Sequence, residues 1–211
     1  MFNISFMQHT LPRLLCAATL ALAASAAVAG PSYHVDIDTA ALAGQSGYLD
    51  FSVIGTLGAP SARATFTNFT SALGNYGIES DRVGAVLGGI PAGFSLANAA
   101  GDNYLTHAIS FGGLYGFDVS FSGDYQSVSS PDGASFAVGL YNASFTDYQQ
   151  QARFDVQPAF GTSGASVTPF ALGAGVSIAA LNTSPVPEPA SWAMMLTGLF
   201  VTGAIARRRR R

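Results

Sequence analysis

Between residues 30 and 184, apolar and polar side chains alternate with a period of two, and this alternation restricts the fold more than any other feature. Residues 115–122 (YGFDVSFS) give the clearest case, with an aromatic or aliphatic side chain at every odd position. Because successive side chains of a β-strand point to opposite faces, the pattern predicts strands with one face in a core and one face in water. Residues 33–38, 48–53 and 135–141 repeat it.

Weaker runs of the same kind cover residues 64–70, 82–87, 104–111, 152–157 and 175–181. Turn signals such as Gly112-Gly113 and Pro131-Asp132-Gly133 separate the runs. No segment of this body has the capped apolar stripe of an amphipathic helix. Roughly nine short strands with these separations predict an all-β body, an antiparallel β-sandwich that is jelly-roll-like, over residues 30–184. A flattened barrel is the alternative.

The composition of the body excludes several classes of function. It has no cysteine, so it contains neither a disulfide framework nor a thiolate metal site. Arg63, Arg82 and Arg153 are its only basic residues apart from histidine, and they stand against eleven acidic residues, which gives a net charge of −8. Such a surface repels phosphate backbones, so we expect no nucleic-acid partner.

Residues 1–29 match a secretory signal peptide. Arg13 supplies the positive charge, residues 14–24 form a short apolar stretch, and Ala27 and Ala29 are the small residues of an A-x-A cleavage site. The apolar stretch is too short to span a bilayer, so an uncleaved anchor fits less well. We therefore expect the chain to be exported.

Residues 185–211 form a tail with three parts in order: a proline-rich segment, an apolar segment and a basic cluster. The proline-rich segment is expected to be extended and accessible, because proline fixes φ and lacks an N–H donor. As a helix, the seventeen uncharged residues 190–206 would span roughly 25 Å, slightly less than a bilayer core of about 30 Å. The residues that carry these roles are Val186, Pro187, Glu188 and Pro189 in the extended segment, Trp192 at one membrane interface, and Arg207, Arg208, Arg209, Arg210 and Arg211 at the other.

This order of Pro-Glu-Pro, apolar helix and terminal arginine cluster resembles the PEP-CTERM sorting signal of Gram-negative bacteria. The resemblance covers only the tail. It implies that an exosortase, an integral-membrane protease or transpeptidase, recognises residues 186–189 and processes a chain that is held transiently in the inner membrane. The setting that it implies is an exopolysaccharide-producing, biofilm-forming bacterium. The resemblance implies a route to the cell surface or the extracellular matrix and no activity, and a plain C-terminal membrane anchor is the alternative.

The body offers few groups for catalysis or for metal binding. It has no G-x-S-x-G motif, and a Ser-His-Asp site would have to use His34 or His107. His34, Asp36 and Asp38 share one face of a predicted strand, but at about 7 Å between successive side chains they are too far apart to bind one ion together. A calcium site is more plausible at Asp102-Asn103 or at Asp132, although a tight turn explains Asp132 fully. We expect no cofactor.

Glycans are the remaining class of ligand. Glycoside hydrolysis needs two facing carboxyl groups, and nothing in the sequence selects such a pair, even where Glu79 lies near Asp81. Tyr125, Tyr141 and Tyr148 lie near turns or off the predicted core face, so they are candidates for stacking on sugars or, alternatively, simple edge tyrosines.

Together these patterns predict a non-enzymatic, exported protein with a structural or adhesive role in the extracellular matrix or at the cell surface. The first alternative is an extracellular polysaccharide-binding or polysaccharide-hydrolysing protein. An ice-binding role would need a flat, regular threonine face, for which Thr65, Thr67 and Thr70 are too few.

Overall fold

The computed structural model describes residues 30–71 and 76–181, which form β-strands joined by turns and loops. The strands of this part are β1 (Ser32–Asp38), β2 (Ser46–Gly55), β3 (Arg63–Ser71), β4 (Ile78–Val83), β5 (Val86–Gly89), β6 (Gly93–Ala97), β7 (Asn103–Ser110), β8 (Leu114–Ser122), β9 (Ala134–Asn142), β10 (Tyr148–Gln157), β11 (Ser166–Leu172) and β12 (Val176–Leu181). Two short 3-10 helices, η2 (Ala40–Leu42) and η3 (Asp124–Gln126), lie between strands.

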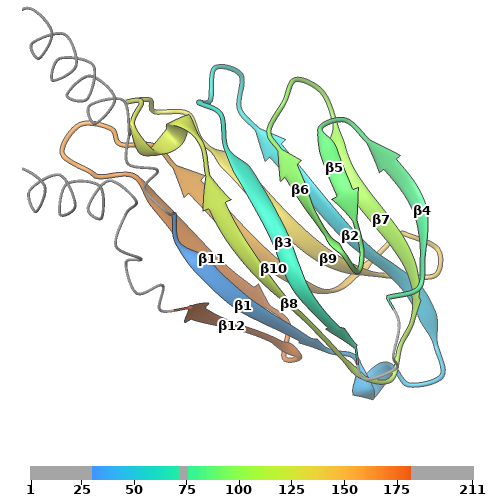
Figure 1. Cartoon of the computed structure of the whole chain (residues 1–211). Helices are drawn as coiled ribbons and strands as arrows, with labels where there is room; N and C mark the ends of the chain where they lie inside the picture. Colours follow the sequence, from blue (N-terminus) through green and yellow to red (C-terminus); the bar gives the residue numbers. More distant parts are fainter. Residues whose placement is uncertain (1–29, 72–75, 182–211) are drawn as a thin grey trace, which may run out of the picture. The chain divides into compact units, whose positions relative to one another are not determined.

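These strands pair into two six-stranded sheets, and all neighbours are antiparallel. Sheet A has the order β12-β1-β8-β3-β6-β5, and sheet B has the order β11-β10-β9-β2-β7-β4. Figure 1 shows the sheets as two layers, with β1, β8 and β3 in one and β10, β9 and β2 in the other. The prediction of an all-β, sandwich-like body is therefore confirmed.

The alternation of the sequence assigns the inner and outer faces of the strongest strands correctly. In β8, Tyr115, Phe117, Val119 and Phe121 are at most 1% exposed, while the residues between them are more exposed or are glycine. Strands β1, β2 and β9 likewise bury the apolar side chains that the alternation places in the core. One polar residue of β2, Asp50, departs from the expectation, because it is buried although it lies on the outer face.

In one place the structure divides a predicted strand in two. A single strand was predicted over residues 82–87, but β4 ends at Val83 and β5 begins at Val86. Between them Gly84 has a φ of 75°, and a Cβ there would lie 2.3 Å from the side-chain oxygen of Asn103. A residue with a side chain would not fit, so the chain turns at this glycine.

Strands β6 and β11 were not predicted. Strand β11 is the edge of sheet B, and its side chains are mostly exposed, so the alternation that marks a half-buried strand is missing from its sequence. It also contains Pro169, a residue that sheets tolerate mainly on edge strands.

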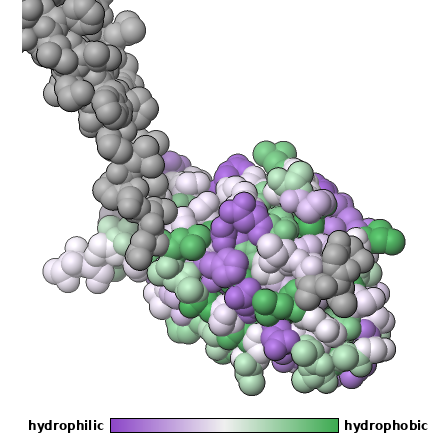
Figure 2. Space-filling view, turned by 60° about the horizontal axis from the view of Figure 1, so that its bottom comes forward, coloured by the Kyte–Doolittle hydropathy of each residue, from purple (hydrophilic) through white to green (hydrophobic). Residues whose placement is uncertain are grey.

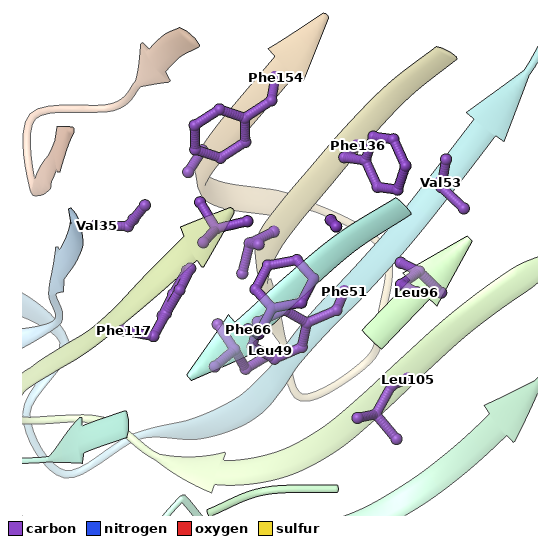
Figure 3. Packing of buried hydrophobic residues seen from close by; sticks show 14 of the residues in the cluster. Val35, Leu49, Phe51, Val53, Phe66, Leu96, Leu105, Phe117, Phe136 and Phe154 are labelled. Atoms are coloured by element: carbon purple, nitrogen blue, oxygen red, sulfur yellow. The ribbon is translucent and has the colours of Figure 1, made fainter. Parts of the chain in front are cut away.

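The core lies between the sheets and is rich in phenylalanine. The ring of Phe51 from sheet B lies 5.1 Å from Phe66, 5.0 Å from Phe94 and 5.6 Å from Phe117, all from sheet A, and each pair meets edge to face. Figure 3 shows the rings of Phe51, Phe66 and Phe117 with the aliphatic side chains of Leu49 and Leu96. Edge-to-face aromatic pairs each add about 0.5–1.5 kcal/mol beyond the burial of area, so this cluster joins the two sheets.

The predicted signal peptide (residues 1–29) and the predicted sorting tail with its membrane span (residues 190–206) lie outside the described residues. Within residues 30–71 and 76–181, no helix is both long and apolar enough to cross a membrane.

Candidate functional site

A groove lies on the outer face of sheet B, over β2, β4 and β7. Its volume is about 420 Å³, and we refer to it below as the sheet-B groove. Its lining residues are Tyr48, Asp50, Ser52, Ser80, Asp81, Tyr104, Thr106 and Phe145.

The strand register brings the polar residues of the groove together. Asp50 of β2 is paired with Thr106 of β7, and Thr106 is paired with Asp81 of β4, so the three form one row across the sheet. A bulge between Glu79 and Asp81 inserts Ser80 into β4, and the Ser80 hydroxyl donates a hydrogen bond of 3.1 Å to the Thr106 carbonyl. Bulges commonly redirect side chains in this way, and here both Ser80 and Asp81 line the groove.

Aromatic side chains form one wall of the groove. Phe145, in the turn between β9 and β10, stacks on Tyr141 at 4.2 Å and meets Tyr48 edge to face at 5.2 Å. Tyr148 lies against the other side of Tyr141, with ring centroids 4.1 Å apart. The Tyr148 ring also covers Gly139, where a Cβ would lie 2.4 Å from Tyr148 Cε1. The four rings therefore form one aromatic cluster beside the polar row. Phe145 and Tyr148 are its exposed members, and Tyr48 and Phe145 are the members that line the groove.

Asp50 is the most unusual residue of the groove. The alternation correctly places it on the outer face, but we expected it to face water, and it is only 7% exposed. Its Oδ1 accepts a hydrogen bond of 2.6 Å from the Thr106 hydroxyl. Burial raises the pKa of the Asp50 carboxyl, the hydrogen bonds from Thr106 and Ser52 offset this in part, and the charge of Asp81 adds to the increase. Carboxyl groups with perturbed pKa values are enriched at functional sites.

Asp81 and Tyr104 form the opposite, more open side of the groove. The Tyr104 hydroxyl donates a hydrogen bond of 2.9 Å to Asp81 Oδ2, and Asp81 Oδ1 accepts one of 2.8 Å from the backbone N–H of Arg82. The hydrogen bond to Asp81 raises the pKa of Tyr104. The tyrosine ring is thereby held in place at the rim.

A second depression continues the sheet-B groove along the strands. It has a volume of about 450 Å³ and shares Tyr48 with the groove. Its floor includes Ile78 and Ala108, which are paired in the row next to that of Asp81 and Thr106. Since successive rows on one face lie about 7 Å apart, the two depressions together offer an extended binding surface.

Of the three tyrosines proposed as sugar-stacking residues, the structure brings two together. Tyr141 and Tyr148 are cross-strand partners on β9 and β10 and belong to the aromatic wall. The interpretation of Tyr125 is wrong, because η3 places this side chain in the core at 2% exposure.

Among the contacts of the described residues, neither histidine is part of a Ser-His-Asp arrangement. Both ring nitrogens of His34 face carboxylates, with Nδ1 2.6 Å from Asp118 and Nε2 3.3 Å from Asp36, so neither is directed at a nucleophile. His107 points into the core, where its Nδ1 lies 3.1 Å from the Tyr76 carbonyl, and burial lowers its pKa.

One of the proposed calcium ligands, Asn103, serves another purpose. The amide of Asn103 bonds to the backbone of Ala85, Ala99 and Gly101 and so holds the loops around it. In the part of the chain that the structure describes, no group of three or more His, Cys, Asp or Glu side chains is arranged to hold a metal ion.

The predicted processing and sorting residues lie outside the described residues. These are Ala27, Ala29, Val186, Pro187, Glu188, Pro189, Trp192, Arg207, Arg208, Arg209, Arg210 and Arg211.

Sequence reasoning missed Asp50, Tyr104 and Phe145. One available signal was the short spacing of Tyr141, Phe145 and Tyr148 around a turn, which places three aromatic rings at one hairpin end. Asp50 gave no such signal, since its burial comes from other strands. Searches against protein-family models, curated proteins and solved structures find no match to this chain.

Proposed function

We propose that this protein is exported to the cell surface or extracellular matrix and there binds polysaccharide chains through the sheet-B groove. The observation that carries the proposal is the combination in one groove of exposed aromatic rings with carboxyl and hydroxyl groups. Sugar rings have apolar faces that stack on aromatic side chains and hydroxyl edges that bond to carboxylates and hydroxyls. A groove that is open along the sheet suits a chain better than a free monosaccharide, and the role is therefore structural or adhesive.

The route to the surface is the second part of the proposal. The signal peptide at residues 1–29 directs export, and an exosortase recognises Val186 to Pro189 and processes the chain. The support for this route is the order of the three parts of the tail in the sequence and the resemblance to PEP-CTERM proteins. The inner membrane holds the chain only transiently.

We also infer that the body is jelly-roll-like. Strands β1 and β3 belong to sheet A, and β2 and β4 belong to sheet B. Two later strands then insert between them: β8 lies between β1 and β3, and β7 lies between β2 and β4. This interleaving supports a jelly roll, to which β9, β10 and β11 add strands beyond β2 in sheet B and β12 adds an edge strand beside β1 in sheet A.

Hydrolysis of a glycosidic bond is a second candidate function, because the groove contains two carboxyl groups in one row. Asp50 and Asp81 are two strands apart, so their backbones are separated by about 10 Å. Inverting glycosidases place their carboxyl groups roughly 6.5–9.5 Å apart and raise the pKa of the acid, as burial does for Asp50. Release of reducing ends from a bound polysaccharide would identify this activity, and binding without release would exclude it for that polymer.

Replacing a wall tyrosine should weaken polysaccharide binding. We expect Tyr148→Ala to reduce affinity roughly five- to tenfold in affinity electrophoresis with a panel of soluble polysaccharides, because one stacking ring is lost. Phe160→Ala is the matched control, since Phe160 is similarly exposed at 57% but is not a member of the ring cluster beside the groove. Equal retardation of both variants and the parent protein would contradict the proposal.

Replacing Glu188 should separate export from processing. We expect Glu188→Ala to leave export intact while the unprocessed form accumulates in the membrane, because Glu188 is the only charge of the recognition segment. Intact mass of the protein from the native host measures this, and the processed parent should begin at Gly30 and end near Pro189. A parent protein that retains its terminal arginines would instead indicate a plain membrane anchor.

A further inference from the structure

The sheet-B groove is acidic and carries no compensating cation. Its lining includes Asp50 and Asp81 and no basic side chain among the described residues. Both carboxyl groups accept hydrogen bonds from neutral donors, Thr106 and Tyr104, and in the described part of the chain neither belongs to an ion pair. A carboxyl group that is buried without a cation is costly, and a positively charged ligand would remove that cost.

The side chains of the three arginines of the body are engaged with partners outside the groove. Arg63 donates to the Ser95 hydroxyl on sheet A at 2.7 Å, and Arg82 is paired with Glu79 at 2.7 Å. Arg153 is paired with Asp155 at 3.2 Å and lies over the Phe170 ring at 4.7 Å. The potential in the groove therefore attracts cations and repels anions.

The aromatic wall has the same preference. Aromatic ring faces carry the negative part of the aromatic quadrupole, which attracts ammonium groups, and Tyr48 and Phe145 line the groove. Rings of this kind beside carboxylates form a site in which a sugar face and an amino group are recognised together.

We propose that the sheet-B groove selects polysaccharides that carry free amino groups, such as chains of 2-amino-2-deoxyhexose. This inference rests on the proposed function and names its ligand class. The sugar rings stack on Tyr48 and Phe145, and the ammonium groups pair with Asp81 at the open side and with Asp50 at the floor. Polymers of uronic acids are repelled by the same carboxylates, and N-acetylated chains stack on the rings without forming the ion pairs.

Binding of three oligosaccharides to the full chain in mild detergent tests the inference. The probes are a glucosamine hexamer, its fully N-acetylated counterpart and an oligouronate of equal length, measured by calorimetry at a pH at which the amino groups are protonated. We expect the amino form to bind about tenfold more tightly than the acetylated form, with the preference falling as salt is added, and the oligouronate not to bind.

Two variants assign the preference to the groove. Asp81→Asn should reduce the preference for the amino form severalfold while leaving the affinity for the acetylated form unchanged. Asp36→Asn is the matched control, because it makes the same change in net charge on the outer face of sheet A. Equal binding of amino and acetylated forms, or preference for the oligouronate, would overturn this inference and leave polysaccharide binding intact. Absence of binding to all three probes and to the polysaccharide panel would overturn the proposed function as well.

Discussion

On the outer face of sheet A, two carboxylates hold the imidazole of His34. Asp118, on the neighbouring strand β8, lies 2.6 Å from Nδ1, and its other oxygen accepts a hydrogen bond of 2.7 Å from Asn68. The hydrogen bond to Asp118 raises the pKa of His34, and the nearby charge of Asp36 adds to this effect. Desolvation by itself would raise the pKa of the Asp118 carboxyl. The hydrogen bonds from Asn68 and His34 outweigh this effect, so the pKa is lowered.

These two shifts define a pH window for stability. Because the pKa of His34 is raised on folding, its contribution is fully present below the unfolded pKa of about 6.5 and is lost as pH rises through the folded value. The contribution of Asp118, whose pKa is lowered, is present above about 3.9 and is lost as pH falls through its folded value. The pair therefore stabilises the fold most between these limits.

Replacing His34 should remove this pH dependence. We expect His34→Gln to lower the free energy of unfolding at pH 5.5 by at most about 1 kcal/mol, since both partners are partly exposed and solvent screens them. At pH 8.5 the difference from the parent protein should be close to zero. Urea unfolding at the two pH values measures this difference in the free energy of unfolding. An equal loss of stability at both pH values would show that His34 acts through packing alone.

At the scale of elements, the hairpin of β9 and β10 presents the aromatic wall. Its turn is held by Asn142, whose Oδ1 accepts a hydrogen bond of 3.0 Å from the backbone N–H of Thr146. Within this turn Phe145 has a φ of 56°, a strained conformation for an aromatic residue, and its ring completes the stack on Tyr141. The strain occurs where the proposed ligand contacts the protein.

Adding a methyl group under Tyr148 should disturb the wall without disturbing the sheet. In Gly139→Ala, the new Cβ would lie 2.4 Å from Tyr148 Cε1, so the exposed ring must turn outward. We expect several-fold weaker polysaccharide binding and a far-UV circular dichroism spectrum like that of the parent protein. Ala137→Ser, two residues earlier on the same strand face, is the control and should bind normally. Unchanged binding by Gly139→Ala would show that the position of Tyr148 is unimportant.

For the whole molecule, packing between the sheets is the main source of stability. The only cysteine of the chain, Cys16, precedes the body, so no disulfide supports the fold. The surface has few charged residues, since only 10% of the chain is charged. On the face shown in Figure 2, strongly hydrophobic residues lie singly among paler and hydrophilic ones. Scattered apolar residues of this kind are normal for a soluble surface, so the groove is distinguished by the kinds of side chain that it combines.

Truncation of Phe51 should destabilise the fold strongly. It is fully buried and contacts aromatic rings from three strands of sheet A, so Phe51→Ala removes transfer free energy and leaves a cavity. We expect a loss of about 3–5 kcal/mol in the free energy of unfolding by urea. Ile54→Ala on the same strand is the control, because Ile54 is 77% exposed and its loss should cost little. Equal effects would show that the sheets do not depend on this cluster.

The alternation along the chain was sufficient to assign the core-facing side chains of the strong strands. Tyr33, Val35 and Ile37 are buried as the alternation predicts, because the two faces of a strand follow from local backbone geometry. The sequence also contains the pattern of the C-terminal tail, on which the sorting proposal depends. The weak edge strand β11 was missed, because its exposed side chains leave no alternation to detect.

Only the tertiary structure decided the candidate site. Asp50 and Thr106 are 56 residues apart, and their contact depends on which strand pairs with β2 and in which register. The same register adds Asp81 to the row, and the hairpin of β9 and β10 adds the aromatic wall. Alternation gives the face of each residue but not its neighbour on the next strand, since strand pairing is set by packing across the whole sandwich.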